Sequence, residues 1–174
     1  MSLLFHLSLH VFLALLAGFF VWLLWRRPVV SFAAAFLGGV LIDLDHLIDY
    51  FLAFGLHFRL DYFLQGYQFL KSDKLYVLFH GWEYVVLLAV LAFAMKSKLW
   101  LKSAILSLSL GMFFHLLIDV NINDGMTLKG YSVFYRTAQG FEIQEIMTPE
   151  HYKDHQLRKQ GATFLDEPAL SDKL

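Results

Sequence analysis

The sequence predicts an all-α, integral membrane protein built on a four-helix bundle. Of its 174 residues, 58% are hydrophobic and 17% are aromatic, a composition typical of membrane proteins. The apolar residues gather in four runs, each close to the ~20 residues with which a helix crosses a bilayer. Most ionisable side chains within these runs lie toward one end of an up-and-down bundle, which predicts one polar site at one membrane face.

We expect the spanning helices at residues 5–25, 29–53, 75–95 and 99–120. The first run lacks the basic start and the small-residue cleavage site of a secretory signal, so we interpret it as a retained helix. Arg26 and Arg27 follow this run, and lysines surround the turn between the last two spans: Lys96, Lys98 and Lys102. By the positive-inside rule both turns are cytoplasmic, which places the polar site on the extracytoplasmic side of the inner membrane.

Residues 54–74 interleave aromatic and polar side chains, a pattern typical of segments that lie in the headgroup region of a bilayer. We expect an interfacial loop or helix here, between the second and third spans, either packed over the bundle or forming a lid or lipid-guiding helix over the site. A membrane-embedded domain is expected over residues 1–140. Residues 141–174 should form a polar tail, partly disordered and loosely ordered from about residue 151.

The composition disfavours several classes of protein. The net charge of −1 provides no basic surface, so nucleic acid is not an expected partner. Because the chain has no cysteine, any metal must be held by nitrogen and oxygen ligands. The sequence contains neither the Gly-x-Ser-x-Gly elbow of serine hydrolases nor a phosphate-cradling loop, which disfavours nucleophilic serine chemistry and nucleotide-driven chemistry.

The densest polar motif is GGVLIDLDHLIDY at residues 38–50. On a helix, Asp45, His46 and Asp49 share a face, and Asp43 lies at its edge. Three carboxylates near one imidazole repel one another at low dielectric unless a cation or protons neutralise them, so the motif predicts a divalent metal site. The alternative is that the helix leaves the bilayer near Asp43 and that these acids are solvated.

The third and fourth spans contribute matching side chains. His115 and Asp119 are four residues apart, so they share a helical face and can ligate one ion or form a hydrogen-bonded pair. His80 and Glu83 are three residues apart on the third span. We take His80 as a candidate ligand. Glu83 is a candidate ligand, general base or interhelical hydrogen-bond partner.

The first span carries His6 and His10 one turn apart, and the deeper His10 is the better ligand candidate. Its alternative is an interfacial histidine. Asp49 and Glu83 are the candidate catalytic residues, because a carboxylate beside the metal ligands can act as a general base and take a proton from an attacking water.

Together these motifs resemble the YdjM-like inner-membrane metal-dependent hydrolases, a family distantly similar to zinc-dependent phospholipase C and P1 nuclease. The shared features are an N-terminal His, an Asp-x-Asp-His ending the second helix, a His early in the third helix and a His-x-x-x-Asp late in the fourth. The resemblance covers residues 1–140 and implies metal binding by seven residues: His10, Asp43, Asp45, His46, His80, His115 and Asp119. Many members carry His-Arg-Gly and then Thr-His-Ser before the third helix, whereas this chain reads KLYVLFHGWEY there.

The stretch YSVFYRTAQGFE at residues 131–142 is also similar to some relatives. Within it, Arg136 is a candidate for bidentate binding of a substrate phosphate. The alternative is an exposed arginine among anionic lipid headgroups.

We therefore predict a membrane-bound, metal-dependent hydrolase that acts on a phosphoester or lipid-like substrate arriving through the bilayer. Zinc is the first expected cofactor and manganese or iron the next, because imidazole favours these ions over magnesium. The same acids would serve a cation transporter or a non-catalytic adaptor stabilised by metal. A b-type haem protein would pair the histidines, but haem ligation does not call for carboxylates beside them.

Overall fold

The computed structural model describes residues 3–96, 98–122 and 125–165, and this part of the chain is helical, as predicted. The elements are α1 (Leu3–Trp25), α2 (Pro28–Gly39), η1 (Leu41–Asp45), α3 (His46–Phe54), α4 (Leu60–Leu64), α5 (Tyr67–Ser72), α6 (Trp82–Ala94), α7 (Leu99–Ile122), η2 (Leu128–Tyr131), α8 (Val133–Ala138), α9 (Ile143–Ile146), α10 (Pro149–Gly161) and η3 (Thr163–Leu165). Two isolated β-bridges occur, and no strand forms within the described ranges.

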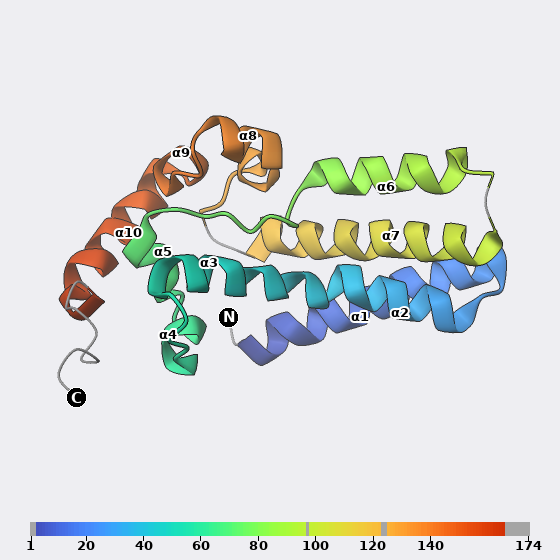
Figure 1. Cartoon of the computed structure of the whole chain (residues 1–174), viewed down its shortest axis with the longest axis horizontal. Coiled ribbons are helices and arrows are strands. Elements are labelled where there is room, and N and C mark those ends of the chain that lie inside the picture. Colours follow the sequence, from blue (N-terminus) through green and yellow to red (C-terminus); the bar gives the residue numbers. More distant parts are fainter. Residues whose placement is uncertain (1–2, 97, 123–124, 166–174) are drawn as a thin grey trace.

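Two helices, α1 and α7, are long and apolar enough to cross a membrane. α2 and the η1–α3 segment form a bent pair, and the pair would be a third span if its two parts cross the membrane as one segment. α6 is a shorter apolar helix of 13 residues. Figure 1 shows α7 between α6 on one side and α1 and α2 on the other, with the four helices running alternately in opposite directions. Two helices of spanning length are consistent with the predicted membrane protein.

Small residues let α2 and α7 approach closely. A methyl group added at Gly38 would lie 2.4 Å from the backbone oxygen of Leu108, and one added at Gly111 would lie equally close to the backbone of α2. The buried hydroxyls of Ser31 and Ser103 hydrogen-bond across the same contact at 2.8 Å. Small and hydroxylated side chains are the usual contacts between membrane helices. This packing holds the end of α2 against the last turns of α7.

The second predicted span, residues 29–53, is not one straight helix. α2 ends at Gly39, Val40 leaves the helical conformation with φ −133° and ψ −50°, and the chain continues as the 3₁₀ turn η1 before α3. The axis bends by 46° at this break. A 3₁₀ turn has about 3.0 residues per turn instead of 3.6, so Asp43 and Asp45 do not keep the helical phase that the sequence predicts for them.

The third predicted span starts later than expected. The sequence predicts a helix from residue 75, whereas α6 begins at Trp82. Residues 75–81, which we call the strap, form irregular backbone between α5 and α6. Buried carboxylates and an arginine bind the N–H and C=O groups of the strap, so its backbone is satisfied without a helix.

Residues 125–165 form a lobe of short helices at one end of the bundle (Figure 1). The longest of them, α10, packs on α5. The sequence predicts loose order from about residue 151, whereas α10 begins with Pro149 in its first turn and continues to Gly161. Residues 166–174 of the predicted tail lie outside the described residues. The expected interfacial segment, residues 54–74, contains the short helices α4 and α5.

Candidate metal centre

Seven histidine and aspartate side chains meet where the start of α1, the η1–α3 junction, the strap and the end of α7 come together. They form four overlapping groups, in each of which one ligand atom per residue lies within 4.8 Å of the others. The groups are His6, His10 and Asp119; His10, Asp43 and His115; Asp43, His46 and His80; and His80, His115 and Asp119. Six of these side chains are among the predicted ligands. His6 was not among them, and the predicted ligand Asp45 belongs to none of the four groups.

Two buried histidines face one another through their Nε2 atoms. His115 Nδ1 lies 3.1 Å from the carbonyl oxygen of Gly39, which can only accept, so Nδ1 carries the proton. His80 Nδ1 in the same way donates to Asp45 Oδ2 at 3.1 Å. In neutral rings both Nε2 atoms therefore carry lone pairs, and these two atoms lie 3.1 Å apart. Lone pairs at this distance repel one another unless a proton or a metal cation accepts them.

Asp43 and Asp119 bring negative charge to the same point. Asp43 Oδ1 lies 3.3 Å from Nε2 of both His80 and His115. Asp119 Oδ2 lies 3.2 Å from His115 Nε2 and 3.8 Å from His80 Nε2. Burial by itself lowers the pKa of the His80 imidazole, but hydrogen bonds to Asp43 and Asp45 raise that pKa above its usual value. The surroundings of His80 therefore favour positive charge.

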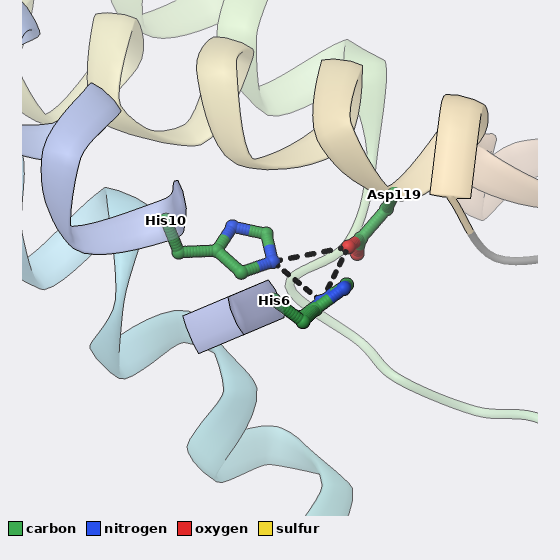
Figure 2. A group of neighbouring side chains, drawn as sticks. All are labelled: His6, His10 and Asp119. Carbon is green, nitrogen blue, oxygen red and sulfur yellow. Dashed lines mark hydrogen bonds and ion pairs between the residues drawn. The ribbon is translucent and has the colours of Figure 1, made fainter. Parts of the chain in front are cut away.

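Figure 2 shows the other arm of the cluster, where two histidines of α1 meet Asp119 of α7. His10 Nε2 lies 2.7 Å from His6 Nε2 and 3.3 Å from Asp119 Oδ1. The same Asp119 oxygen lies 3.5 Å from His6 Nε2. The sequence favours His10 as a ligand because it lies deeper in the span than His6. The spacing of four between the two histidines is the signal that would have included His6, since it puts both rings on one helical face.

The cluster is open along one edge. Three of its side chains are partly exposed, Asp43 by 39%, His46 by 30% and His6 by 22%, while the other four are buried. His46 Nε2 lies 3.7 Å from Asp43 Oδ1 at this edge. Leu44 and Ile48, which neighbour these two residues in the chain, are 57% and 36% exposed. Exposed apolar residues are therefore close in the chain to the polar opening.

Asp45 lies behind His80 rather than among the converging ligand atoms. Its Oδ2 accepts the Nδ1 proton of His80 and, at 2.8 Å, the backbone N–H of Phe79. A carboxylate in this position fixes the orientation of the imidazole and raises its basicity toward a metal. Asp49, predicted as a catalytic group, is buried, and its two oxygens accept N–H groups of the strap at 2.7 and 3.0 Å.

Glu83 and Arg136 lie where the lobe contacts the bundle. Glu83 accepts the hydroxyl proton of Ser132 and two backbone N–H groups at the start of α8, at 3.2 and 3.3 Å. Its carboxylate therefore caps α8. Arg136 is fully buried and donates to the carbonyls of two strap residues, each at 2.9 Å, and to that of Gly130 at 2.6 Å. This burial excludes the alternative of an exposed arginine among headgroups.

No protein-family model, curated protein or solved structure matches this chain. Function must therefore be inferred from the donor atoms themselves. Imidazole nitrogens with carboxylate oxygens, and no sulfur, suit zinc, manganese or iron, whereas magnesium and calcium prefer oxygen ligands. The converging side chains fit such an ion, because their free nitrogens and oxygens point at one another.

Proposed function

We propose that this chain is a membrane-bound, metal-dependent hydrolase whose histidine and aspartate cluster holds divalent metal, with zinc as the first candidate. The observation that carries the proposal is the pair of Nε2 atoms of His80 and His115, 3.1 Å apart and each 3.3 Å from Asp43 Oδ1. Metal binding requires unprotonated nitrogens and ionised carboxylates. The hydrogen bonds at both Nδ1 atoms favour that state by leaving the Nε2 lone pairs directed at the cluster.

We propose further that the cluster holds more than one ion. The seven side chains form four overlapping ligand groups, which would hold more than one ion between them. One ion would bind near His6, His10 and Asp119, and another near Asp43, His46 and His80. A single tetrahedral ion takes about four ligands, fewer than the side chains that converge here.

The bound metal would supply Lewis acidity, which polarises a phosphoryl oxygen and brings the pKa of a water toward ~7. The chain supplies the proton acceptor. Asp43 is the partly exposed carboxylate at the opening, so we assign it the removal of the proton from an attacking water. Asp49 and Glu83, the carboxylates that the sequence predicts for this role, have oxygens that bind backbone N–H groups of the strap and of α8.

We propose a lipid-like phosphoester as the substrate class. The exposed apolar residues Leu44 and Ile48 each lie within two positions of the polar Asp43 or His46 in the chain. A polar site edged by apolar side chains suits an amphiphile whose head reaches the ligands while its chains stay among the apolar helices.

We propose that α1, α2 with α3, α6 and α7 cross the inner membrane together, with the cluster on the extracytoplasmic side. Arg26, Arg27 and Lys96 lie at the opposite end of the bundle from the cluster, which supports this orientation. A cysteine introduced at Lys96 should be protected from an impermeant thiol reagent added to intact cells. A cysteine at the exposed Lys129 of the lobe should react. The reverse labelling pattern would contradict the orientation.

Purified protein supplied with Zn²⁺ should release phosphate or a headgroup from a panel of phosphoester lipids, and a chelator should stop the reaction. His115→Ala protein should be inactive, whereas His155→Ala protein, altered in the lobe, should retain activity. Metal-loaded protein that shows no turnover above the His115→Ala control would contradict the hydrolase proposal. Metal flux into liposomes would then identify a cation transporter, and its absence would favour an adaptor.

A further inference from the structure

The strap carries His80 into the metal centre, although it has no regular structure of its own. Figure 1 shows this segment linking α5 to α6 and passing between α3 and the lobe. Its position therefore depends on what binds its backbone. Three buried side chains bind it: two carboxylates bind its N–H groups, and one arginine binds its carbonyls.

Carboxylates of the bundle bind the N–H groups. Asp49 accepts from Tyr76 at 2.7 Å and from Val77 at 3.0 Å, and Asp45 accepts from Phe79 at 2.8 Å. Both carboxylates are buried, with relative exposures of 2%. Charge-assisted hydrogen bonds of this kind are stronger than neutral ones, so they fix the strap against α3 and η1.

Arg136 of the lobe binds the carbonyls. Its Nη2 donates to Val77 O and its Nη1 to His80 O, each at 2.9 Å. The side chain is fully buried, and burial lowers the pKa of its guanidinium. Among the described residues no carboxylate forms an ion pair with it, so the principal contacts of this buried cation are backbone carbonyls. A planar guanidinium with donors in a fixed fork is suited to holding several carbonyls at once.

The backbone conformation of Val77 indicates that contacts with the rest of the protein impose the conformation of the strap. Its φ is +30°, in the region that β-branched residues rarely adopt. Its N–H is bound by Asp49 and its carbonyl by Arg136. A strained residue persists only where its surroundings determine its conformation from more than one side.

The lobe that carries Arg136 is itself tied to the first residue of the strap, Leu75, and to Asp73, which precedes the strap. Phe141 O accepts the backbone N–H of Leu75 at 2.9 Å, and Asp73 O accepts that of Ile143 at 3.0 Å. The lobe therefore forms hydrogen bonds with the strap at three places: its first residue, Val77 and His80.

We propose that Arg136 is a positioning residue of the metal centre: by holding the carbonyls of Val77 and His80, it keeps the His80 ring against Asp45 with Nε2 directed at the cluster. The inference rests on the metal centre proposed above. It gives the lobe a function, which is to complete the site by fixing one of its ligands from outside the bundle.

The test compares Arg136→Met and Arg136→Lys with a matched control, Arg158→Met, which removes another arginine–carbonyl bond of the same lobe, to Gln65 O. The first readout is amide hydrogen exchange of residues 75–81 in metal-free protein. The second is the rate at which a chelator removes Co²⁺ from loaded protein. Arg136→Met should accelerate strap exchange and speed cobalt release by about tenfold or more, the effect usual for loss of a group that orients a ligand. Arg136→Lys should show a smaller effect, and Arg158→Met none.

A double mutant separates positioning from a general loss of stability. In a His80→Ala background, Arg136→Met should change cobalt release by less than about twofold, because the ligand through which it acts is already absent. An undiminished effect in that background would overturn the proposal, as would wild-type strap exchange in folded Arg136→Met or Arg136→Lys protein. If Arg136→Met does not fold, strap exchange and cobalt release are both measured on Arg136→Lys instead. Wild-type protein that holds no cobalt would count against the metal centre, while strap exchange would still decide whether Arg136 fixes the segment.

Discussion

Two clusters of aspartate and histidine lie at one end of this molecule, and they neutralise negative charge by different means. Where α10 meets α5, Asp73 contacts the ammonium of Lys159 and lies 3.0 Å from His155 Nε2. In the metal centre, the ion-pair contacts of Asp43 and Asp119 are, among the described residues, all with imidazoles. One cluster contains a permanent cation of its own, and the other does not.

This difference indicates where a metal belongs. The Asp73 side chain is 40% exposed and has a lysine, so neither burial nor lack of a partner calls for an added cation. Asp119 is almost fully buried and faces imidazole rings, which carry a positive charge only when they are protonated. The buried arginine of the lobe, Arg136, binds backbone carbonyls instead. Carboxylates buried without a cation are costly, and a divalent ion removes that cost.

The largest expected effect is the loss of metal affinity when a ligand of the metal centre is removed, whereas the matching change in the Asp73 cluster should have none. His115→Ala should lower metal affinity by more than the ~10–100-fold typical of losing an orienting group, because it removes a donor atom and leaves Asp43 and Asp119 less compensated. His155→Ala, in the Asp73 cluster, should leave metal content unchanged. Elemental analysis of both purified variants measures this. Equal metal content in the two proteins would end the distinction between the clusters.

A smaller effect is expected when charge is removed from behind a ligand. In Asp45→Asn protein the side-chain oxygen can still accept the His80 Nδ1 proton, but the negative charge that raises the basicity of the ring is lost. Metal affinity should fall by ~10–100-fold while the helices remain folded. Asp61→Asn, which alters an exposed pair with Arg59, is the matched control and should have no effect. Competition titration with a chelator gives both affinities. Wild-type affinity in Asp45→Asn protein would contradict the orienting role.

The smallest effect concerns stability and pH in the Asp73 cluster. Burial alone raises the pKa of Asp73, but hydrogen bonds from Lys159 and His155 lower it, and the net shift is downward. Its contribution to stability is therefore present above its unfolded pKa and is lost as pH falls through the lower, folded pKa. Because the side chain is 40% exposed, solvent screening limits the contribution to about 0.5 kcal/mol.

Thermal unfolding of wild-type and Asp73→Asn protein in detergent, measured from pH 7 downward, checks this prediction. The wild type should be slightly more stable at pH 7, and the difference should shrink below about pH 4, near the ordinary pKa of aspartate. A difference that grows as the pH falls would show that the sign of the shift is wrong.

The sequence predicts those features that depend on one continuous helix. His115 and Asp119 meet as expected because α7 runs unbroken from Leu99 to Ile122 and keeps its helical phase. The same reasoning applied to Asp45 misplaces its side chain, since the 3₁₀ turn η1 changes the phase and directs it behind His80.

The remaining features depend on contacts between distant parts of the chain. His80 reads as part of an apolar helix, yet it lies on the strap because Asp49 binds backbone N–H groups 27 and 28 residues further along. Arg136 reads as a surface arginine, yet it contacts the carbonyl of His80, 56 residues away. Hydropathy and periodicity carry no information about such contacts, because they describe only the local order of side chains.

The central claim is that a metal ion replaces the cation that the chain itself does not supply to Asp43 and Asp119. The most direct test is the number of metal ions per chain in protein extracted from membranes in mild detergent, without chelator, and measured by elemental analysis. We predict more than one zinc, manganese or iron ion per wild-type chain, and less than half of that content in His115→Ala protein. Wild-type protein that carries no such metal, even after incubation with Zn²⁺, would contradict the account and leave protons as the ions that neutralise the cluster.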